Sequence, residues 1–192
     1  MTQSNATRRT ALFLDRDGVL DDLVFHADTG GWEAPRNADE VRLRPRVREA
    51  LRRAADAGWL IFVVSNQPDA AKRRTSMRSL KSAHARLVRL LEDAPIADFF
   101  YCFHRAEEKC RCRKPKPYFV MQAAERYGID LAQSWFVGDN ASDIECGRRA
   151  GTRTALIDYE HSAEKRGQQR ADLVCRDLAH FVRLLTARKS VP

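Results

Sequence analysis

The stretch ALFLDRDGVL, residues 11–20, decides the fold of this chain. Four apolar residues lead into two aspartates, Asp15 and Asp17, which are separated by one residue and followed by a glycine. A short apolar run bounded by polar residues is typical of a buried strand. Two carboxylates this close would raise the pKa of one of them by mutual repulsion. A divalent cation would remove that conflict, so the stretch predicts a strand that ends at a metal site.

Apolar runs alternate with amphipathic stretches along the rest of the chain. Strands are predicted at residues 11–14, 60–64, 99–103, 135–137, 154–157 and 173–175. Helices are predicted at residues 46–57, 77–92, 118–127, 142–150 and 177–187. This alternation indicates an α/β fold, a three-layer Rossmann-like arrangement of a mostly parallel sheet between helices, without a separate cap domain. We expect one domain over residues 10–187, a flexible N-terminus over 1–9 and a C-terminal tail over 188–192.

Polar side chains follow three of the predicted strands. They are Asp15 and Asp17, Ser65 and Asn66, and Asp139. In a parallel sheet, ligands bind beyond the carboxyl ends of the strands, near a switch in strand order, so these groups should converge on one crevice. Carboxylate oxygens suit Mg²⁺, and carboxylates with a metal and a lysine, Lys114, suit phosphoryl transfer. The alternative is that each residue is an ordinary turn residue at the end of a strand.

A long stretch with little periodicity lies between Gly18 and Arg44. Loops of that length in a compact domain are functional or disordered. Because its glycines and Trp32 follow the paired aspartates, we predict a loop that faces the substrate. We expect surface or packing roles for His84, His161 and His180. His26 is the exception, because it lies in this loop.

A second group of candidate ligands lies in YCFHRAEEKCRC, residues 101–112. It consists of Cys102, His104, Cys110 and Cys112. Four soft ligands suit tetrahedral Zn²⁺, and four protein ligands leave no open position, so this zinc would be structural. It would fold the loop that carries Arg113 and Lys114. The alternative is a pair of buried cysteines with chance neighbours, which is the role we expect for Cys146 and Cys175.

The composition limits the partners. A net charge of +8 suits an anionic partner, either a phosphorylated metabolite or a nucleic acid. The basic run KRRTSMRSLK, residues 72–81, is predicted to be a solvated helix start, with nucleic-acid contact as the alternative. No apolar run is long enough to cross a membrane, and the polar start resembles no signal peptide. The cytoplasm is therefore the expected location.

Four segments of the chain resemble a known family. FLDRDGVL, VVSNQ, CRKPKP and VGDNASDIECGRRAG are similar, in order and spacing, to the four motifs of the haloacid dehalogenase superfamily of phosphatases, over about residues 10–158. Within that superfamily the chain most resembles the D-glycero-D-manno-heptose 1,7-bisphosphate 7-phosphatases, with the histidinol-phosphate phosphatases as near neighbours. The resemblance implies Mg²⁺-dependent hydrolysis through an aspartyl-phosphate, with a phosphorylated sugar as substrate. We expect the protein to be a monomer.

The resemblance also implies roles for individual residues. Asp15 would be the nucleophile and Asp17 the general acid and then base, while Ser65 and Lys114 would hold the transferring phosphoryl group. Magnesium would be bound by Asp15, the main-chain carbonyl of Asp17, and Asp139, with Asp143 as support behind them. Zinc would be bound by the cysteine and histidine cluster. Substrate contacts would come from Asn66, Gln67, Arg113 and Lys114.

The chain departs from the family pattern at several positions. Asn140 stands where lysine or arginine is usual, Asp69 and Arg73 stand where glycines are usual, and Asp21 stands where asparagine is typical. Three other functions compete: a histidinol-phosphate or other small-metabolite phosphatase, a regulatory module without turnover, and a nucleic-acid-end phosphatase. The intact catalytic set disfavours the second. The absence of a cap and of an aromatic stacking platform disfavours the third, so a nucleic-acid partner is not expected.

Overall fold

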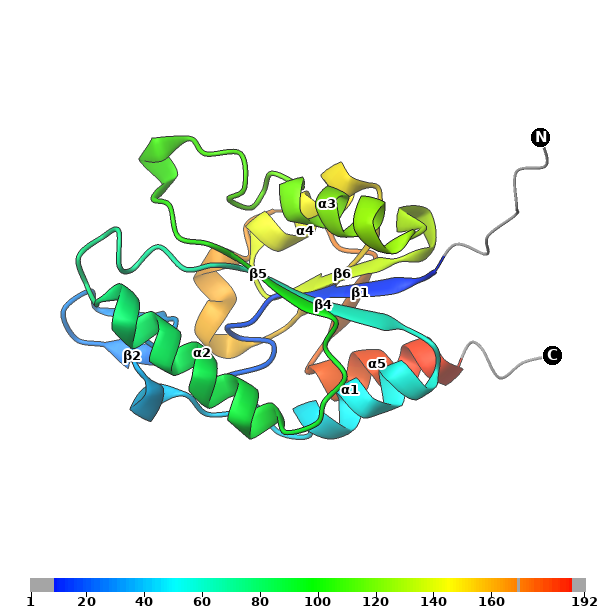
Figure 1. Ribbon diagram of the computed structural model, residues 1–192, viewed down its shortest axis with the longest axis horizontal. Coiled ribbons are helices and arrows are strands. Elements are labelled where there is room, and N and C mark those ends of the chain that lie inside the picture. Colours follow the sequence, from blue (N-terminus) through cyan, green and yellow to red (C-terminus); the bar gives the residue numbers. More distant parts are fainter. Residues whose placement is uncertain (1–8, 169, 188–192) are drawn as a thin grey trace.

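Six parallel strands form one sheet at the centre of the molecule (Figure 1). The computed structural model describes residues 9–168 and 170–187, so the predicted terminal segments 1–9 and 188–192 lie outside the described residues except for Arg9. The strand order is β5-β4-β1-β6-β7-β8. The strands are β1 Ala11–Leu14, β4 Leu60–Asn66, β5 Asp98–Cys102, β6 Trp135–Gly138, β7 Arg153–Ile157 and β8 Leu173–Cys175. All six predicted strands are confirmed, with β5 one residue earlier than expected and β4 two residues longer, so that Ser65 and Asn66 end the strand rather than follow it.

Helices cover both faces of the sheet (Figure 1). Three pack on one face, α1 Val47–Asp56, α2 Met77–Leu91 and α5 Leu178–Ala187, and two on the other, α3 Tyr118–Tyr127 and α4 Ala141–Ala150. Alternate residues of a strand point to opposite faces, so Leu12 and Leu14 join one core while Ala11 and Phe13 join the other. Both faces are buried, which explains why β1 is a continuous apolar run and confirms the three layers.

The helix boundaries agree with the sequence to within one residue. In the turn before α2, Ser76 accepts a hydrogen bond from the N–H of Ser79 at 3.0 Å and caps the helix. Gly128 closes α3 with φ at 66°, and Gly58 follows α1 with φ at 84°, both left-handed positions that favour glycine. No helix of the described chain is long and apolar enough to cross a membrane.

The long loop after β1 contains regular structure that the sequence analysis did not predict. Strands β2 Val24–His26 and β3 Gly31–Glu33 pair as an antiparallel hairpin, and a short 3₁₀ helix, η1 Ala38–Glu40, follows. Three-residue strands are too short to show a period of two in the sequence. The hairpin lies beyond the carboxyl end of β1 (Figure 1), and the described residues between β1 and α1 form no separate cap domain.

The order of the strands places the functional crevice. From β1 the chain continues to β4 and β5 on one side of the sheet, then crosses to β6, β7 and β8 on the other. The carboxyl end of β1 is therefore the point where the strand order reverses, and ligands of parallel sheets bind at such points. Asp15 and Asp17 follow β1 directly, as the sequence predicted.

Candidate active site

Three buried carboxylates meet at the carboxyl ends of the central strands. Asp15 follows β1, Asp139 follows β6, and Asp143 lies in the first turn of α4. A carboxylate oxygen from each lies within 4.8 Å of the other two. Burial and repulsion from Asp15 raise the pKa of Asp139 to about 7, and the same two causes raise the pKa of Asp143. A set of buried oxygen ligands with this excess of negative charge fits a hard divalent cation such as Mg²⁺.

Two glycines make room for these carboxylates. A Cβ atom on Gly18 would lie 2.2 Å from Oδ2 of Asp139, and φ of Gly18 is 79°. A Cβ atom on Gly138 would lie 2.2 Å from the Cβ of Asp143. Close packing at the site therefore requires glycine at both positions, and the left-handed backbone at residue 18 also favours glycine there.

Lys114 is the cation inside the carboxylate cluster. Its Nζ lies 2.8 Å from Oδ1 of Asp15 and 2.7 Å from Oδ1 of Asp143, and donates to the carbonyl of Val64 at 2.8 Å. Burial lowers the pKa of Lys114, but the attraction of Asp143 and Asp15 outweighs it and raises that pKa above its ordinary value. Lys114 therefore carries a permanent positive charge between Asp15 and Asp143.

Asn66 fixes the backbone of Lys114. Its side-chain oxygen accepts the N–H of Lys114 at 3.0 Å, and its side-chain nitrogen donates to the Lys114 carbonyl at 3.2 Å. The sequence analysis predicted that Asn66 contacts the substrate. The structure shows that its side chain binds the backbone of Lys114. The last residue of β4 thus positions the lysine that comes from the loop after β5.

Asp17 belongs to a separate buried network. Its Oδ1 accepts from Nε and Nη2 of Arg16 at 2.8 and 2.5 Å. Its Oδ2 accepts from Oγ of Ser65 at 3.2 Å and from Nε2 of Gln67 at 2.5 Å. Arg16 is 1% exposed and lies over the ring of Tyr101. The sequence analysis missed Arg16, although an arginine between two aspartates at a strand end could have suggested a buried ion pair.

A cavity of about 360 Å³ opens beside these groups. It is lined by seven of the residues expected from the sequence, Asp15, Asp17, Asn66, Gln67, Arg113, Lys114 and Asp139. Ser65 is buried at the edge of the cluster, in contact with Asp17. The sequence analysis did not assign four further charged residues of the lining to the site, namely Glu33, Asp69, Lys72 and Lys165. Nothing in the local sequence around Lys72 or Lys165 points to the cavity.

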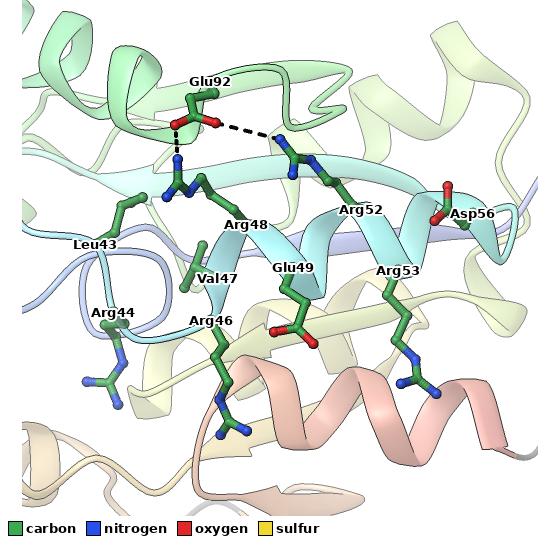
Figure 2. A pocket seen from close by; sticks show the side chains of 10 residues that line it. All are labelled: Leu43, Arg44, Arg46, Val47, Arg48, Glu49, Arg52, Arg53, Asp56 and Glu92. Atoms are coloured by element: carbon green, nitrogen blue, oxygen red, sulfur yellow. Dashed lines mark hydrogen bonds and ion pairs between the residues drawn. The ribbon is translucent and has the colours of Figure 1, made fainter.

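A larger hollow of about 940 Å³ lies elsewhere, along α1 (Figure 2). Its lining is rich in arginine, but the charges are largely paired: Arg46 with Asp177, and both Arg48 and Arg52 with Glu92. None of the three clustered carboxylates lines it. We therefore assign the chemistry to the smaller cavity.

The predicted zinc ligands also come together. The Sγ of Cys102 lies 3.6 Å from Nδ1 of His104 and 3.6 Å from Sγ of Cys110. The Sγ of Cys112 lies 3.4 Å from Sγ of Cys102, 3.4 Å from Nδ1 of His104 and 3.6 Å from Sγ of Cys110. Tetrahedral sulfur ligands about 2.3 Å from a zinc ion lie about 3.8 Å from one another. The arrangement fits a zinc ion with four protein ligands.

Loss of one of these ligands should empty the zinc site. We expect Cys110→Ser to lower the zinc content from about one ion per chain to well below half, because three ligands hold zinc much less tightly. Turnover should fall indirectly, since Arg113 donates to the carbonyl of His104 at 3.2 Å and would lose this anchor. Elemental analysis and steady-state kinetics measure the two effects.

Cys175→Ser is the matched control for this prediction, because Cys175 is a buried cysteine at the end of β8, outside the cluster. It should keep its zinc. Wild-type protein prepared without chelators and free of zinc would contradict the site, and full zinc in the Cys110→Ser protein would contradict the ligand set.

The structure shows the surroundings of the residues that depart from the family pattern. Asn140 caps α4, accepting from the N–H of Ser142 at 3.1 Å. Arg73 adopts φ of 59°, a conformation that glycine favours. Asp21 is fully buried, with Oδ2 at 3.6 Å from Nε of Arg16. Asp69 lies in the cavity wall between two arginines.

Comparison with known proteins identifies the class to which this fold and site belong. A family model described as HAD-hydrolase-like matches residues 111–181. The chain is also 35% identical, over 155 residues, to a D-glycero-β-D-manno-heptose-1,7-bisphosphate 7-phosphatase of Pseudomonas aeruginosa, a match that covers 78% of this chain and 81% of that protein. The chain therefore belongs to the haloacid dehalogenase-like (HAD) hydrolases, and it is a phosphatase.

Further relatives are named for the same activity. The Pseudomonas putida protein of that name is 33% identical over 179 residues, covering 91% of this chain and 98% of its own length. Among solved structures, the D,D-heptose 1,7-bisphosphate phosphatase of B. bronchiseptica, complexed with magnesium and phosphate, superimposes with a TM-score of 0.80. That match is 27% identical and covers 93% of this chain and 99% of the other.

Proposed function

We propose that this phosphatase removes the C7 phosphate of D-glycero-D-manno-heptose 1,7-bisphosphate, with Mg²⁺ as cofactor and through an aspartyl-phosphate. The observation that carries the reaction is the buried cluster of Asp15, Asp139, Asp143 and Lys114 beside an open cavity. The substrate is supported by the activity for which the relatives are named, and these relatives align over most of the chain. We take residues 10–187 as one catalytic domain.

Asp15 is the proposed nucleophile. Its Oδ1 is held by Lys114 at 2.8 Å and by the N–H of Arg16 at 2.7 Å, which leaves Oδ2 for the attack on phosphorus. Lys114 would at the same time neutralise charge on the phosphoryl oxygens. Magnesium would be held by Asp15, Asp139 and the main-chain carbonyl of Asp17, and would supply positive charge against the repulsion between carboxylate and phosphate. Asp143, paired with Lys114, keeps the lysine in place.

Asp17 is the proposed acid and base. It would give a proton to the leaving sugar oxygen and then take one from the attacking water. Both of its oxygens accept hydrogen bonds from protein donors in this structure. The Oδ2 atom must therefore exchange Ser65 and Gln67 for the substrate, which frees the Ser65 hydroxyl to hold the phosphoryl group.

We also propose that the protein binds a structural zinc ion, is a monomer and is located in the cytoplasm. The zinc would fix the loop of residues 102–112, which leads directly to Arg113 and Lys114. Arg113 lines the cavity, and we propose that it contacts the substrate beyond the phosphoryl group being transferred.

A turnover screen tests the proposed substrate. We expect kcat/KM to be at least about tenfold higher for the heptose 1,7-bisphosphate than for histidinol phosphate or a 3′-phosphorylated DNA end, a preference of roughly 1.4 kcal/mol. Turnover should disappear in buffer freed of Mg²⁺ without a chelator and return with added Mg²⁺, because the buried carboxylates and the phosphate repel one another without the metal ion. Histidinol phosphate as the best substrate would overturn the substrate assignment, and full activity in the Mg²⁺-free buffer would overturn the role of magnesium.

A further inference from the structure

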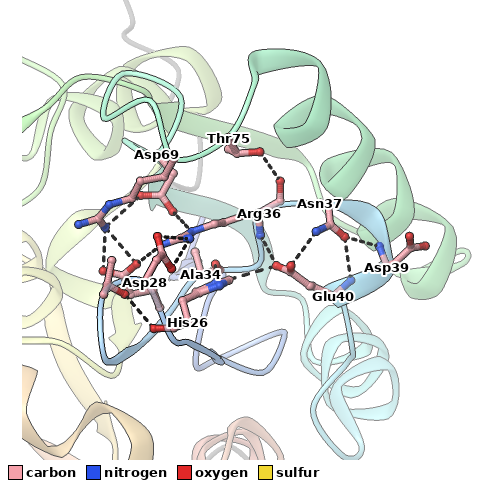
Figure 3. Close-up of polar contacts among 12 residues, drawn as sticks. His26, Asp28, Ala34, Arg36, Asn37, Asp39, Glu40, Asp69 and Thr75 are labelled. Atoms are coloured by element: carbon pink, nitrogen blue, oxygen red, sulfur yellow. Dashed lines mark hydrogen bonds and ion pairs between the residues drawn. The ribbon is translucent and has the colours of Figure 1, made fainter.

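A cluster of alternating charges joins the hairpin to the segment after β4 (Figure 3). Arg36 donates from Nη1 to both oxygens of Asp28, at 2.8 and 2.9 Å, and from Nη2 to Oε2 of Glu33 at 2.9 Å. Arg74 donates to both oxygens of Glu33, at 2.8 and 3.0 Å. Asp69 lies between the two arginines, 3.5 Å from Nε of Arg36 and 3.6 Å from Nη1 of Arg74.

This cluster is rigidly held. The side chain of Arg36 is only 10% exposed. The N–H of Arg36 donates to Oε2 of Glu40 at 2.7 Å, and its carbonyl accepts from the hydroxyl of Thr75 at 2.9 Å (Figure 3). The hairpin is therefore tied at its base to the residues that precede α2. Planar guanidinium groups lose little entropy for each hydrogen bond they form, so carboxylates clamped by them have fixed positions.

Two of the three carboxylates face the active-site cavity. Glu33 and Asp69 line the cavity that also holds Asp15 and Lys114, whereas Asp28 is clamped by the same arginine but does not line it. A carboxylate has about four lone-pair sites, and the arginines occupy only some of them. Both wall residues therefore keep acceptor sites for hydrogen-bond donors inside the cavity, and both repel phosphate.

We propose that Glu33 and Asp69 form a hydroxyl-recognition wall, which accepts hydrogen bonds from the hydroxyl groups of the sugar chain and so selects polyhydroxylated phosphate esters. The inference rests on the proposed function, because it assumes that the phosphoryl group lies at Asp15 and Lys114. The carbon chain of the ester then extends from that end of the cavity along the wall. Bonds to charged acceptors are stronger than neutral ones, and sites built to bind a hydroxyl discriminate against analogues that lack it.

Two esters with the same unbranched six-carbon chain test the wall. Sorbitol 6-phosphate carries hydroxyl groups along its chain, and hexyl phosphate carries none. We expect the wild type to prefer sorbitol 6-phosphate by at least about tenfold in kcat/KM. Glu33→Gln and Asp69→Asn should each lower that preference severalfold, mainly through a higher KM for sorbitol 6-phosphate, because binding energy rather than chemistry is lost.

Asp28→Asn is the matched control. It removes a carboxylate that Arg36 clamps equally well but that lies outside the cavity lining, so it should keep the wild-type preference. The proposal is wrong if Asp28→Asn lowers the preference for sorbitol 6-phosphate as much as Asp69→Asn does. It is also wrong if Glu33→Gln and Asp69→Asn both leave that preference unchanged, or if the wild type hydrolyses the two esters equally well. A failure of the proposed phosphatase reaction is visible separately, as no turnover of either ester with Mg²⁺ present.

Discussion

Asp15→Asn should abolish turnover, by at least roughly four orders of magnitude, and leave the fold intact. Removal of a nucleophile closes the covalent route entirely, and such losses are among the largest seen in enzymes. An asparagine oxygen still accepts the two hydrogen bonds that Oδ1 accepts now, from the N–H of Arg16 and the Nζ of Lys114. Steady-state kinetics with any hydrolysed phosphate ester measures the loss.

The same variant should not lose stability when magnesium is absent. Repulsion from Asp15 raises the pKa of both Asp139 and Asp143, so removing its charge relieves the cluster. We expect a thermal unfolding midpoint in EDTA equal to or above that of the wild type. Asp22→Asn, next to the site but outside the cavity lining, is the control and should keep its activity. Substantial activity in the Asp15→Asn protein would refute the assignment of Asp15 as the nucleophile.

Lys114→Met should have the second largest effect, and it should affect both activity and stability. Loss of one electrostatic donor to the transition state typically costs about 10²–10³-fold in kcat. The change also removes the cation that lies within 2.8 Å of Asp15 and Asp143, and a buried charge left without its partner costs about 3–5 kcal/mol. The thermal midpoint in EDTA should therefore fall clearly, as circular dichroism would show.

Added magnesium separates the two consequences of this substitution. If the carboxylates hold the ion, Mg²⁺ should raise the midpoint of the Lys114→Met protein more than that of the wild type, because it replaces part of the missing charge. Turnover should stay low, since the lysine itself is absent. Lys81→Met, an exposed lysine on α2, should change neither property. A Lys114→Met protein as active and as stable as the wild type would contradict the place of Lys114 in the site.

Much of the fold and of the site could be predicted because the signals are local. The strand β1 is marked by four apolar residues in a row, since both of its faces are buried. Asp15, Asp17 and Asp139 could be grouped from their positions in the sequence, because the strands of a parallel sheet all end at one edge. The four candidate zinc ligands could be grouped because residues 102–112 bring all of them within one short segment.

Other parts of the site had no local signal. The hairpin β2–β3 has three-residue strands, and its position depends on Arg36 and Thr75 rather than on its own periodicity. Glu33 and its partner Arg74 are 41 residues apart. Lys165 reaches the cavity from the segment before β8, where nothing in the sequence marks it.

The sequence by itself determined the three-layer sheet and which carboxylates lie at the carboxyl ends of the central strands, because burial on both faces of a strand and the end of that strand can be recognised from adjacent residues. Only the tertiary structure decided which charges meet. Lys114 could have faced solvent, yet it lies between Asp15 and Asp143, and Arg16 is buried against Asp17. Charges can be removed from water only when partners from distant segments compensate them. That compensation is a property of the folded chain, and no short stretch of sequence contains it.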